Sequence, residues 1–303
     1  MIILSTISNN KVWGTNRLYE YSGDKNIKTI GSVYSVSGIE ELRTKIIYGD
    51  DYEDLYLAIK NNPKKYGLPE GVDYPVIISF TAGDSDLSIQ VHPTDEYAKN
   101  NENKLIGKSE SWYFIEEPKQ GWIYAEAKLD NKPAIRDKIL SGEYEKVVDK
   151  IGITKGDIVY IPSGTLHALT KGSLVYEIQQ STDITYRFYD YARLDDKGQK
   201  RELHLDDAIS TLDTSNKVKI EKLKDDRVVE SKPYSLLKTK LKDYYTNSTT
   251  IAQAITVLSG NLIIEDFTIS KGMSILVLPG ETIKIQKSAN EVMIATPKLY
   301  FME

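Results

Sequence analysis

The sequence predicts an all-β fold, and three observations carry this prediction. Short runs of β-branched and aromatic residues recur along the 303-residue chain, and Gly, Pro and Asn separate them. Helical spacing of apolar residues appears only in a few short segments outside these runs. A chain of this length is also expected to form two compact units, each able to bury its own core. Together these features predict sandwiches or barrels of short strands, decorated by a few helices.

The predicted strands begin with two segments of different pattern. Residues 75–80 form a continuous β-branched and aromatic run, whereas residues 86–92 alternate apolar and polar side chains, and both patterns are typical of strands. The other predicted strands are 111–115, 121–125, 157–161, 174–179, 255–258, 261–264, 273–278 and 282–285.

Helices are predicted where apolar residues have helical spacing, in 51–61, 132–141 and 205–212. The stretch 215–240 is charged, weakly periodic and contains Pro233, so we place the domain junction there. The predicted division is a metal-binding catalytic domain of residues 1–225 and a metal-free domain of residues 226–303.

An internal similarity supports this division. Residues 155–167, KGDIVYIPSGTLH, resemble residues 271–284, KGMSILVLPGETIK, with one more residue between Gly and Pro in the second copy. Both copies predict a strand, a proline turn and a second strand. The first copy ends in His167, whereas the equivalent position of the second is Lys284, and no His follows His204. The C-terminal domain is therefore expected to be a duplicate that has lost its metal site.

The composition excludes several classes of function. The chain has no Cys, which excludes disulfides, thiolate metal ligands and cysteine nucleophiles. Acidic and basic residues are mixed and the formal net charge is −5, so no nucleic-acid partner is expected. No basic and apolar leader opens the sequence and no apolar run is long enough to cross a bilayer, which predicts a cytoplasmic protein without a membrane role.

Four polar residues form a candidate metal centre. Gln90 and His92 stand at i and i+2 in a strand-like segment, so their side chains project from one face of a sheet. Glu110 opens another predicted strand, and His167 follows the turn after Pro162. Two imidazoles, a carboxylate and an amide oxygen suit Zn²⁺, with Mn²⁺, Fe²⁺, Co²⁺ or Ni²⁺ as alternatives. Spacing alone favours a structural role, with hydrogen-bonded histidines in a barrel and Glu110 at the surface.

Longer motifs change this balance. They are DLSIQVHPTDEYA at 86–98, GKSESWY at 107–113, IPSGTLHA at 161–168 and YEIQQSTDITYRFYDY at 176–191. In this order they resemble the type I mannose-6-phosphate isomerases in their short bacterial form, which belong to the cupin superfamily. KVWGTNR at 11–17 and RELHL at 201–205 are also similar to family segments. The resemblance implies two cupin-type jelly-roll β-barrels and an enzyme that interconverts mannose 6-phosphate and fructose 6-phosphate.

The resemblance also implies the site. One Zn²⁺ per chain is expected on Gln90, His92, Glu110 and His167. The active-site positions of the family fall on Lys108, Asp183 and Arg187. The expected partner is a small sugar phosphate, and the expected assembly is a monomer or a homodimer.

The cationic residues have alternative interpretations. Arg187 is interpreted as a cation that faces the sugar phosphate or the reacting oxygens, because a guanidinium group presents a forked set of donors to an anion. Its alternative is a salt bridge with Asp183 or Asp190 at the barrel rim. Lys108 shares the metal-facing side of its strand with Glu110 and is given an acid-base or binding role by the family, whereas an isolated strand lysine is usually solvated.

Two aromatic side chains near the family motifs are also assigned. Trp13 is expected either to wall the pocket or to lie in the core. His204 is expected to cap or pack a helix rather than to serve as a fifth ligand.

Three segments depart from the family pattern. The family carries a lysine eleven residues before the glutamine ligand, where this chain has Ser79, and the segments 31–35 and 82–84 also diverge. These changes leave the proposed metal ligands intact. They suggest a rival function, a catalytically weakened cupin that binds a sugar phosphate as a sensor.

A second rival follows from the ligand types. Two histidines and one carboxylate also form the site of non-haem Fe(II) oxygenases, although Gln90 as a fourth ligand argues against it. In the isomerase, the metal would stabilise the charge that develops on oxygen as a proton moves between C1 and C2. The candidate bases are Lys108, Asp183 and a metal-bound water.

Overall fold

The computed structural model describes residues 1–194 and 198–302, which pack into two compact units. Unit 1 contains Met1–Asn10, Asn16–Phe80 and the chain from Leu223 onward. Unit 2 contains Lys11–Thr15 and Thr81–Lys222. These units follow the packing of the chain and are discontinuous in sequence, whereas the domains 1–225 and 226–303 rest on the sequence alone and stay a prediction.

Unit 1 contains two sheets of short antiparallel strands. The larger has the order β17 (Val228–Glu230), β18 (Tyr234–Thr239), β25 (Glu291–Pro297), β20 (Gln253–Ser259), β23 (Ser274–Val277), β1 (Ile2–Leu4) and β6 (Ile46–Tyr48). The smaller has the order β19 (Tyr244–Thr246), β24 (Thr282–Lys287), β21 (Asn261–Ile264) and β22 (Phe267–Ser270). Apolar residues of both sheets form one buried cluster, which includes Ile255 and Ile294 of the larger sheet and Leu262 and Ile283 of the smaller. Unit 1 therefore contains a β-sandwich closed by its own core.

The remaining elements of unit 1 lie earlier in the chain. They are β3 (Ile30–Val36), the paired strands β4 (Gly38–Ile39) and β5 (Leu42–Arg43), α1 (Leu55–Asn61), and the 3-10 helices Arg17–Tyr21, Pro63–Tyr66 and Tyr300–Met302 at the C-terminal end. Strands β2 (Ile7–Thr15) and β7 (Val76–Ala82) run through points at which the chain passes from one unit to the other.

Unit 2 also builds its core between two antiparallel sheets. One has the order β11 (Val148–Gly152), β10 (Trp122–Ala127), β13 (His167–Ala168), β8 (Ile89–Val91) and β15 (Tyr186–Tyr189). The other contains, in order, β16 (Lys219–Lys222), β12 (Asp157–Ile161), β9 (Glu110–Glu116) and β14 (Leu174–Gln180). Residues from both sheets, among them Trp112, Ile123 and Val159, share one buried cluster.

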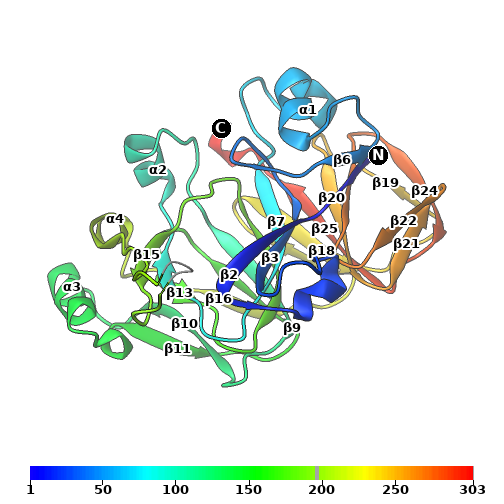
Figure 1. Ribbon diagram of the computed structural model, residues 1–303. Coiled ribbons are helices and arrows are strands. Elements are labelled where there is room, and N and C mark those ends of the chain that lie inside the picture. The colour runs from blue at the N-terminus through cyan, green and yellow to red at the C-terminus, as the bar shows by residue number, and fades with distance from the viewer. Residues whose placement is uncertain (195–197, 303) are drawn as a thin grey trace. The chain divides into compact units, whose positions relative to one another are not determined.

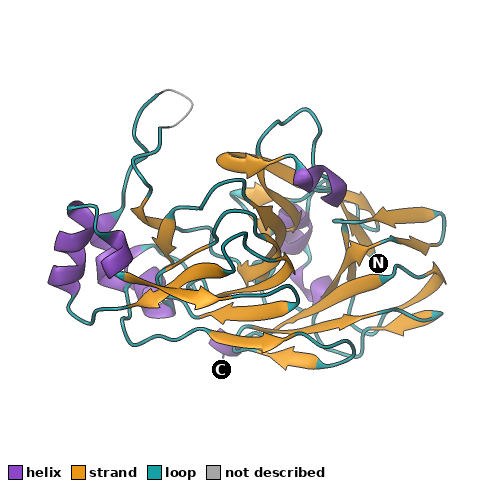
Figure 2. Cartoon of the chain, turned by 90° about the horizontal axis from the view of Figure 1, so that it is seen from below, coloured by secondary structure: helices purple, strands orange, loops and turns teal. Residues whose placement is uncertain are grey.

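The outer face of the first of these sheets is covered by helices. A second buried cluster joins Ile89 and Val91 of β8 to residues of α3 (Lys132–Leu140) and α4 (Leu205–Thr211). Figure 1 shows α4 beside β15 and α3 nearby, and Figure 2 shows how strands dominate the chain. Because successive strand residues face opposite sides, residues 90 and 92 of this segment are left for the inner face between the sheets.

The structure confirms the all-β prediction with decorating helices, and it corrects several boundaries. The predicted strand 86–92 is confined to Ile89–Val91, since Leu87 N–H instead donates to the Leu169 carbonyl of a loop at 2.9 Å and Pro93 has no N–H. The charged stretch 215–240 contains β16, β17 and β18. A helix that the sequence did not predict, α2, spans Asp95–Asn101.

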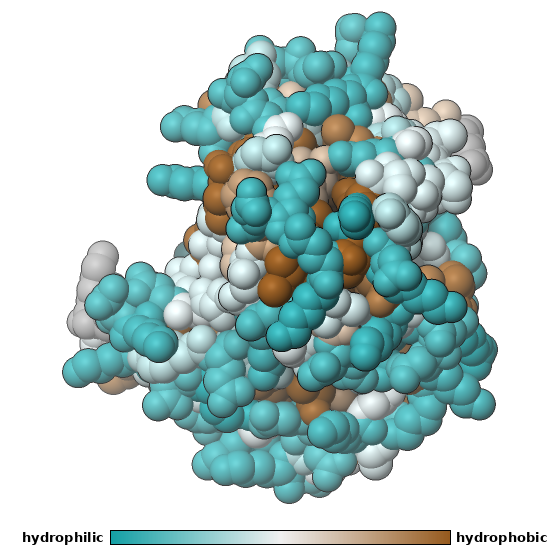
Figure 3. Space-filling view, turned by 90° about the vertical axis from the view of Figure 1, so that its right-hand side faces the viewer, coloured by the Kyte–Doolittle hydropathy of each residue, from teal (hydrophilic) through white to brown (hydrophobic). Residues whose placement is uncertain are grey.

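The surface agrees with the composition. Among the described residues, no helix is long and apolar enough to cross a membrane. The face of the molecule in Figure 3 is mostly hydrophilic, and its hydrophobic patches are small and separated by hydrophilic residues.

Candidate metal centre

Three strands of unit 2 bring the proposed ligands together. His167 of β13 lies directly opposite Gln90 of β8 in the antiparallel register, and His92 follows β8 by one residue. Glu110 is the first residue of β9, which belongs to the facing sheet. The apolar neighbours Ile89 and Val91 anchor β8 in the outer core. Alternation along β8 thus directs the polar residues to the inside of the unit.

The ligand atoms converge on one point. His92 Nε2 lies 3.1 Å from Glu110 Oε2, and His167 Nε2 lies 3.3 Å from Glu110 Oε1. The Gln90 side-chain amide nitrogen is 3.3 Å from His167 Nε2, so a 180° rotation of the amide would turn its oxygen toward the same point. One ligand atom each from His92, Glu110 and His167 lies within 4.8 Å of the other two, and all three residues are buried.

Backbone carbonyls hold both imidazoles in the orientation that a metal requires. His92 Nδ1 lies 3.0 Å from the Ile184 carbonyl oxygen, and His167 Nδ1 lies 2.8 Å from the Thr165 carbonyl oxygen. A carbonyl can only accept, so each Nδ1 carries the proton and donates it. The lone pairs of both Nε2 atoms therefore point toward Glu110, which is the arrangement found in metal-ligating histidines.

The polar atoms at the centre lack the hydrogen bonds that burial normally demands. Within the described part of the chain, His92 Nε2 and both carboxylate oxygens of Glu110 are buried without a hydrogen-bond partner, even though imidazole and carboxylate atoms lie 3.1 Å apart. Such unsatisfied atoms cost about 1–3 kcal/mol each, and more when charged. A divalent cation between them would satisfy all three atoms, so the residues fit a metal.

Electrostatics favour the protonation states of a metal site. Burial, together with the nearby positive charge of Lys108, lowers the pKa of His92 to about 3 and keeps its imidazole neutral. Burial opposes ionisation of Glu110, but the positive charge that His92 and His167 carry when they are protonated outweighs burial and holds the pKa of its carboxyl well below the usual range. Neutral imidazoles and an ionised carboxylate are the forms that bind metals.

The three proposed catalytic residues lie in different environments. Lys108 is 5% exposed, and its Nζ is 3.8 Å from Glu110 Oε2. Arg187 lies opposite Gln90 on β15, and its Nη1 donates to the Glu202 carbonyl at 2.6 Å. Asp183 is exposed. The structure thus brings Lys108 to the proposed metal ligands and leaves Asp183 in contact with solvent.

Arg187 does not form the salt bridge considered as its alternative. Asp190 is instead paired with Arg193 and Arg201, and no ion pair joins Asp183 to Arg187 among the residues that the structure describes. Burial and then the positive charge of Arg201 lower the pKa of the Arg187 guanidinium. An anion beside Arg187 would relieve this crowding of positive charge.

The structure also locates Trp13 and His204, the two aromatic residues assigned from the sequence. Trp13 is 7% exposed and belongs to the core between the two sheets of unit 2. His204 stands at the N-cap of α4 but makes no capping bond with its side chain. Its Nδ1 instead accepts a hydrogen bond from the Arg187 N–H at 3.1 Å. The expected capping role of His204 is therefore replaced by a contact with the strand of Arg187.

Sequence reasoning missed two residues around the centre. Trp112 packs edge-on against the His167 ring, with ring centroids 5.4 Å apart, and its indole N–H lies 3.4 Å from Glu177 Oε1. Its position two residues after Glu110 on one strand was the signal that could have identified it. Lys11 is half-buried, and burial followed by the positive charges of Arg201, Arg187 and Lys108 lowers its pKa. No local pattern relates Lys11 to residues so distant in sequence.

Comparisons with known proteins agree with this geometry. The chain is 36% identical over 217 residues to the probable mannose-6-phosphate isomerase GmuF of Bacillus subtilis, which covers 70% of this chain and 68% of that protein. It is 33% identical over 216 residues to the mannose-6-phosphate isomerase of Streptococcus mutans, covering 70% of this chain and 67% of that protein. No model of a protein family matches the chain.

A solved structure resembles the whole chain. The crystal structure of the mannose 6-phosphate isomerase from Bacillus subtilis superposes with a TM-score of 0.82 at 27% sequence identity, and the match covers 97% of this chain and 99% of that one. The two sequence relatives match about two thirds of their own length, whereas the structural match extends over nearly all of both chains.

Proposed function

Because the chain belongs to the mannose-6-phosphate isomerase family, we propose that it interconverts mannose 6-phosphate and fructose 6-phosphate at the buried centre of His92, Glu110 and His167. The observation that carries this proposal is the convergence of buried Nε2 and carboxylate atoms that lack hydrogen-bond partners within the described residues. Gln90 is the fourth ligand in this proposal.

Zinc is the metal that this ligand set favours. The centre offers two imidazole nitrogens, one carboxylate and one amide, without any thiolate, and such nitrogen and oxygen sets suit Zn²⁺ in sites that keep a position open for substrate. A bound divalent cation would supply Lewis-acid polarisation of the carbonyl and hydroxyl oxygens of the sugar.

The proposed role of Arg187 is to supply fixed positive charge. Its backbone is held by β15, and its guanidinium group is held by the Glu202 carbonyl, so the cation does not have to reorganise during the reaction. Negative charge develops on the sugar oxygens as the C2 proton leaves, and the phosphate is anionic throughout. Either anionic group would be bound by the forked donors of Arg187.

The proposed role of Lys108 is to move the proton. Among the candidate groups, it is the buried one next to the ligands, with Nζ 3.8 Å from Glu110 Oε2, while Asp183 is exposed. A positioned side chain that transfers a proton contributes typically about 10²–10⁴-fold to a rate. Lys108 in its neutral form, after giving up its own proton, would take the proton from C2 and return it to C1, while the proton of the O2 hydroxyl moves to O1.

The test is proton exchange at C2 of mannose 6-phosphate in deuterated water, followed by NMR with zinc-loaded protein. Exchange accompanied by fructose 6-phosphate is expected for the wild type. The His92→Ala variant removes one ligand and is the matched control, in which both signals should disappear. Silence of a wild type that holds stoichiometric zinc would instead indicate another substrate or a sensor that binds without turnover.

A further inference from the structure

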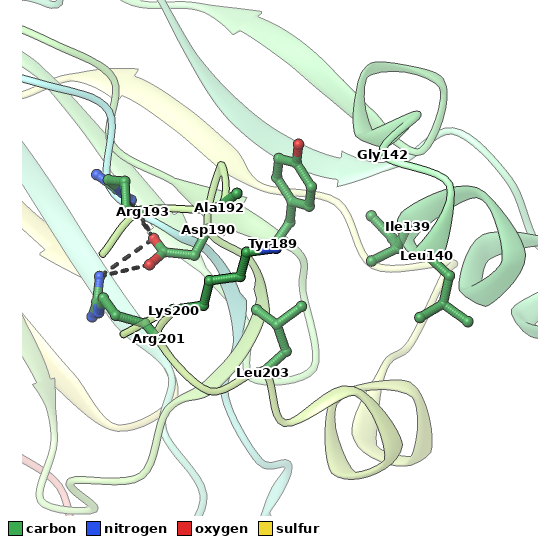
Figure 4. A pocket seen from close by; sticks show the side chains of 10 residues that line it. All are labelled: Ile139, Leu140, Gly142, Tyr189, Asp190, Ala192, Arg193, Lys200, Arg201 and Leu203. Atoms are coloured by element: carbon green, nitrogen blue, oxygen red, sulfur yellow. Dashed lines mark hydrogen bonds and ion pairs between the residues drawn. The ribbon is translucent and has the colours of Figure 1, made fainter. Parts of the chain in front are cut away.

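Unit 2 contains a cavity that none of the proposed metal ligands lines. It has a volume of about 270 Å³, and it lies between the end of α3 and the chain that follows β15 (Figure 4). Ile139, Leu140, Leu203 and the ring of Tyr189 form apolar walls. This volume is slightly below the ~300–1,000 Å³ of typical ligand pockets, which suits a compact molecule with a single ring.

The polar wall of this cavity carries excess positive charge. Arg193, Lys200 and Arg201 line it together with one acid, Asp190. Asp190 is 3% exposed, and Arg201 Nη1 lies 3.1 Å from one of its carboxylate oxygens and 3.3 Å from the other. Arg193 also pairs with Asp190, and its Nη1 donates to the Asp86 carbonyl at 2.5 Å. The two guanidinium groups are thus fixed in place, and three cations against one carboxylate leave the wall suited to an anion.

The turn beside this wall is held in an uncommon conformation. Tyr191 and Ala192 are consecutive residues with φ of 55° and 54°. These angles lie in the left-handed region, which residues other than Gly rarely adopt. Such conformations persist only where surrounding contacts hold them, and they are concentrated at ligand-binding sites. The backbone on this side of the cavity is therefore constrained.

One segment belongs both to the cavity and to the support of Arg187. Lys200, Arg201 and Leu203 line the cavity. Two other residues of the segment contact Arg187: the Glu202 carbonyl accepts from Arg187 Nη1 at 2.6 Å, and His204 Nδ1 accepts from the Arg187 N–H at 3.1 Å. A ligand that fixes residues 200–203 would therefore act on the position of Arg187.

We propose that this cavity is a second binding site for a one-ring organic phosphate, and that its occupancy regulates the isomerase through the segment 200–204. The ring would lie between Leu203 and the apolar wall of Ile139 and Tyr189, and the phosphate would meet Arg201 and Lys200. None of the proposed metal ligands lines this site, and the proposed function does not assign it.

The test uses phenyl phosphate, which has the ring and the phosphate but no hydroxyl to isomerise. Calorimetric titration of zinc-loaded protein should detect binding to wild type and at least tenfold weaker binding to the Lys200→Glu variant, while inorganic phosphate should bind more weakly than phenyl phosphate. Lys64→Glu makes the same charge change at an exposed residue of unit 1 and is the matched control. It should bind phenyl phosphate as wild type does.

The kinetic readout separates this cavity from the active site. Each protein is compared with and without phenyl phosphate at saturating mannose 6-phosphate. Phenyl phosphate should change kcat of the wild type at least twofold and should leave kcat of Lys200→Glu unchanged. Purely competitive inhibition of equal strength in both proteins, or no binding, would overturn the proposal. Binding at the cavity without a change in kcat would overturn its regulatory part.

Discussion

At the scale of single residues, Glu110 determines whether the centre can hold a metal. It is fully buried between two imidazoles whose Nε2 atoms both face it. The isosteric variant Glu110→Gln removes the negative charge that attracts a cation, and its amide N–H can donate to an Nε2 lone pair. We expect at least a tenfold loss of zinc affinity, which is about 1.4 kcal/mol, in a chelator competition. Stoichiometric zinc with unchanged affinity in this variant would contradict the centre.

Lys108 allows chemistry to be separated from metal binding. Lys108→Met keeps much of the volume of the side chain but cannot carry a proton, so kcat should fall by about 10²–10⁴-fold. The zinc content measured on the same preparation should stay at one per chain. Lys108→Arg keeps the charge with a less acidic group and serves as the comparison variant. A parallel loss of zinc and activity would instead assign Lys108 to metal retention.

The sequence indicated much of this centre for a physical reason. The i, i+2 spacing of Gln90 and His92 fixes a shared face on any strand, and that face is the inner one in the structure. The residues that support the centre were not predictable. The carbonyls of Ile184 and Thr165 fix the two imidazoles through backbone atoms, which every residue possesses, so no side-chain pattern marks them.

At the scale of elements, α3 depends on its N-cap. Asn131 Oδ1 accepts a hydrogen bond from the Ala134 N–H at 2.9 Å. Asn131→Ala should lower the free energy of unfolding by about 1 kcal/mol, because the Ala134 N–H loses its partner. Urea unfolding measures this loss. Asn131→Asp retains a capping oxygen and should stay near wild type, so equal losses in both variants would show that the cap is not the cause.

Strand β12 begins at a carboxylate whose ionisation supports folding. Burial alone would raise the pKa of Asp157, but the Thr154 N–H, at 2.7 Å, and Lys222 Nζ, at 2.9 Å, outweigh burial and lower it. The stabilisation is thus present above the unfolded pKa of about 3.9 and is lost as the pH falls through the folded value.

The variant Asp157→Asn tests this pH dependence. The difference in unfolding free energy between wild type and variant should be constant above about pH 5 and should shrink below about pH 4. Urea titrations at several pH values measure it. A difference that does not change between pH 3 and pH 7 would show that the ionised carboxylate contributes nothing.

Local patterns located short strands rich in β-branched residues better than elements without an apolar pattern. The predicted strands 157–161 and 261–264 have the bounds of β12 and β21. The helix α2 was missed because its sequence, DEYAKNN, buries only Ala98 and therefore has no apolar stripe. Its start is set by Thr94, whose side chain accepts from the Tyr97 N–H at 3.2 Å.

At the scale of the whole molecule, a bound metal should stabilise the protein measurably. The proposed ligands lie on three strands that are distant in sequence, so the complete site exists only in the folded state. Zinc at about 1,000 times its Kd should add about 4 kcal/mol to the free energy of unfolding. Thermal unfolding with zinc and with a chelator measures the shift. His92→Ala should show a much smaller shift, and an equal shift would mean that zinc binds elsewhere.

The division of the chain into units was beyond sequence patterns. Ile2 of β1 lies opposite Leu276 of β23, and Ile3 lies opposite Tyr48 of β6. The residue pattern of a segment predicts that it forms a strand. It does not predict which strand it pairs with, because the backbone hydrogen-bonding groups of all strands are the same. The partner is chosen by packing of the completed sandwich, which links the first residues to the last ones.

This pairing of early and late strands has a consequence for folding during translation. Residues 81–222 emerge before β23 and β25 have been translated, so unit 2 can condense while β1 still waits for its neighbour. Strand β1 must therefore stay soluble, with its N–H and C=O groups unpaired on one edge, until β23 has been made. The nascent chain is expected to need protection at β1 until β23 has been translated.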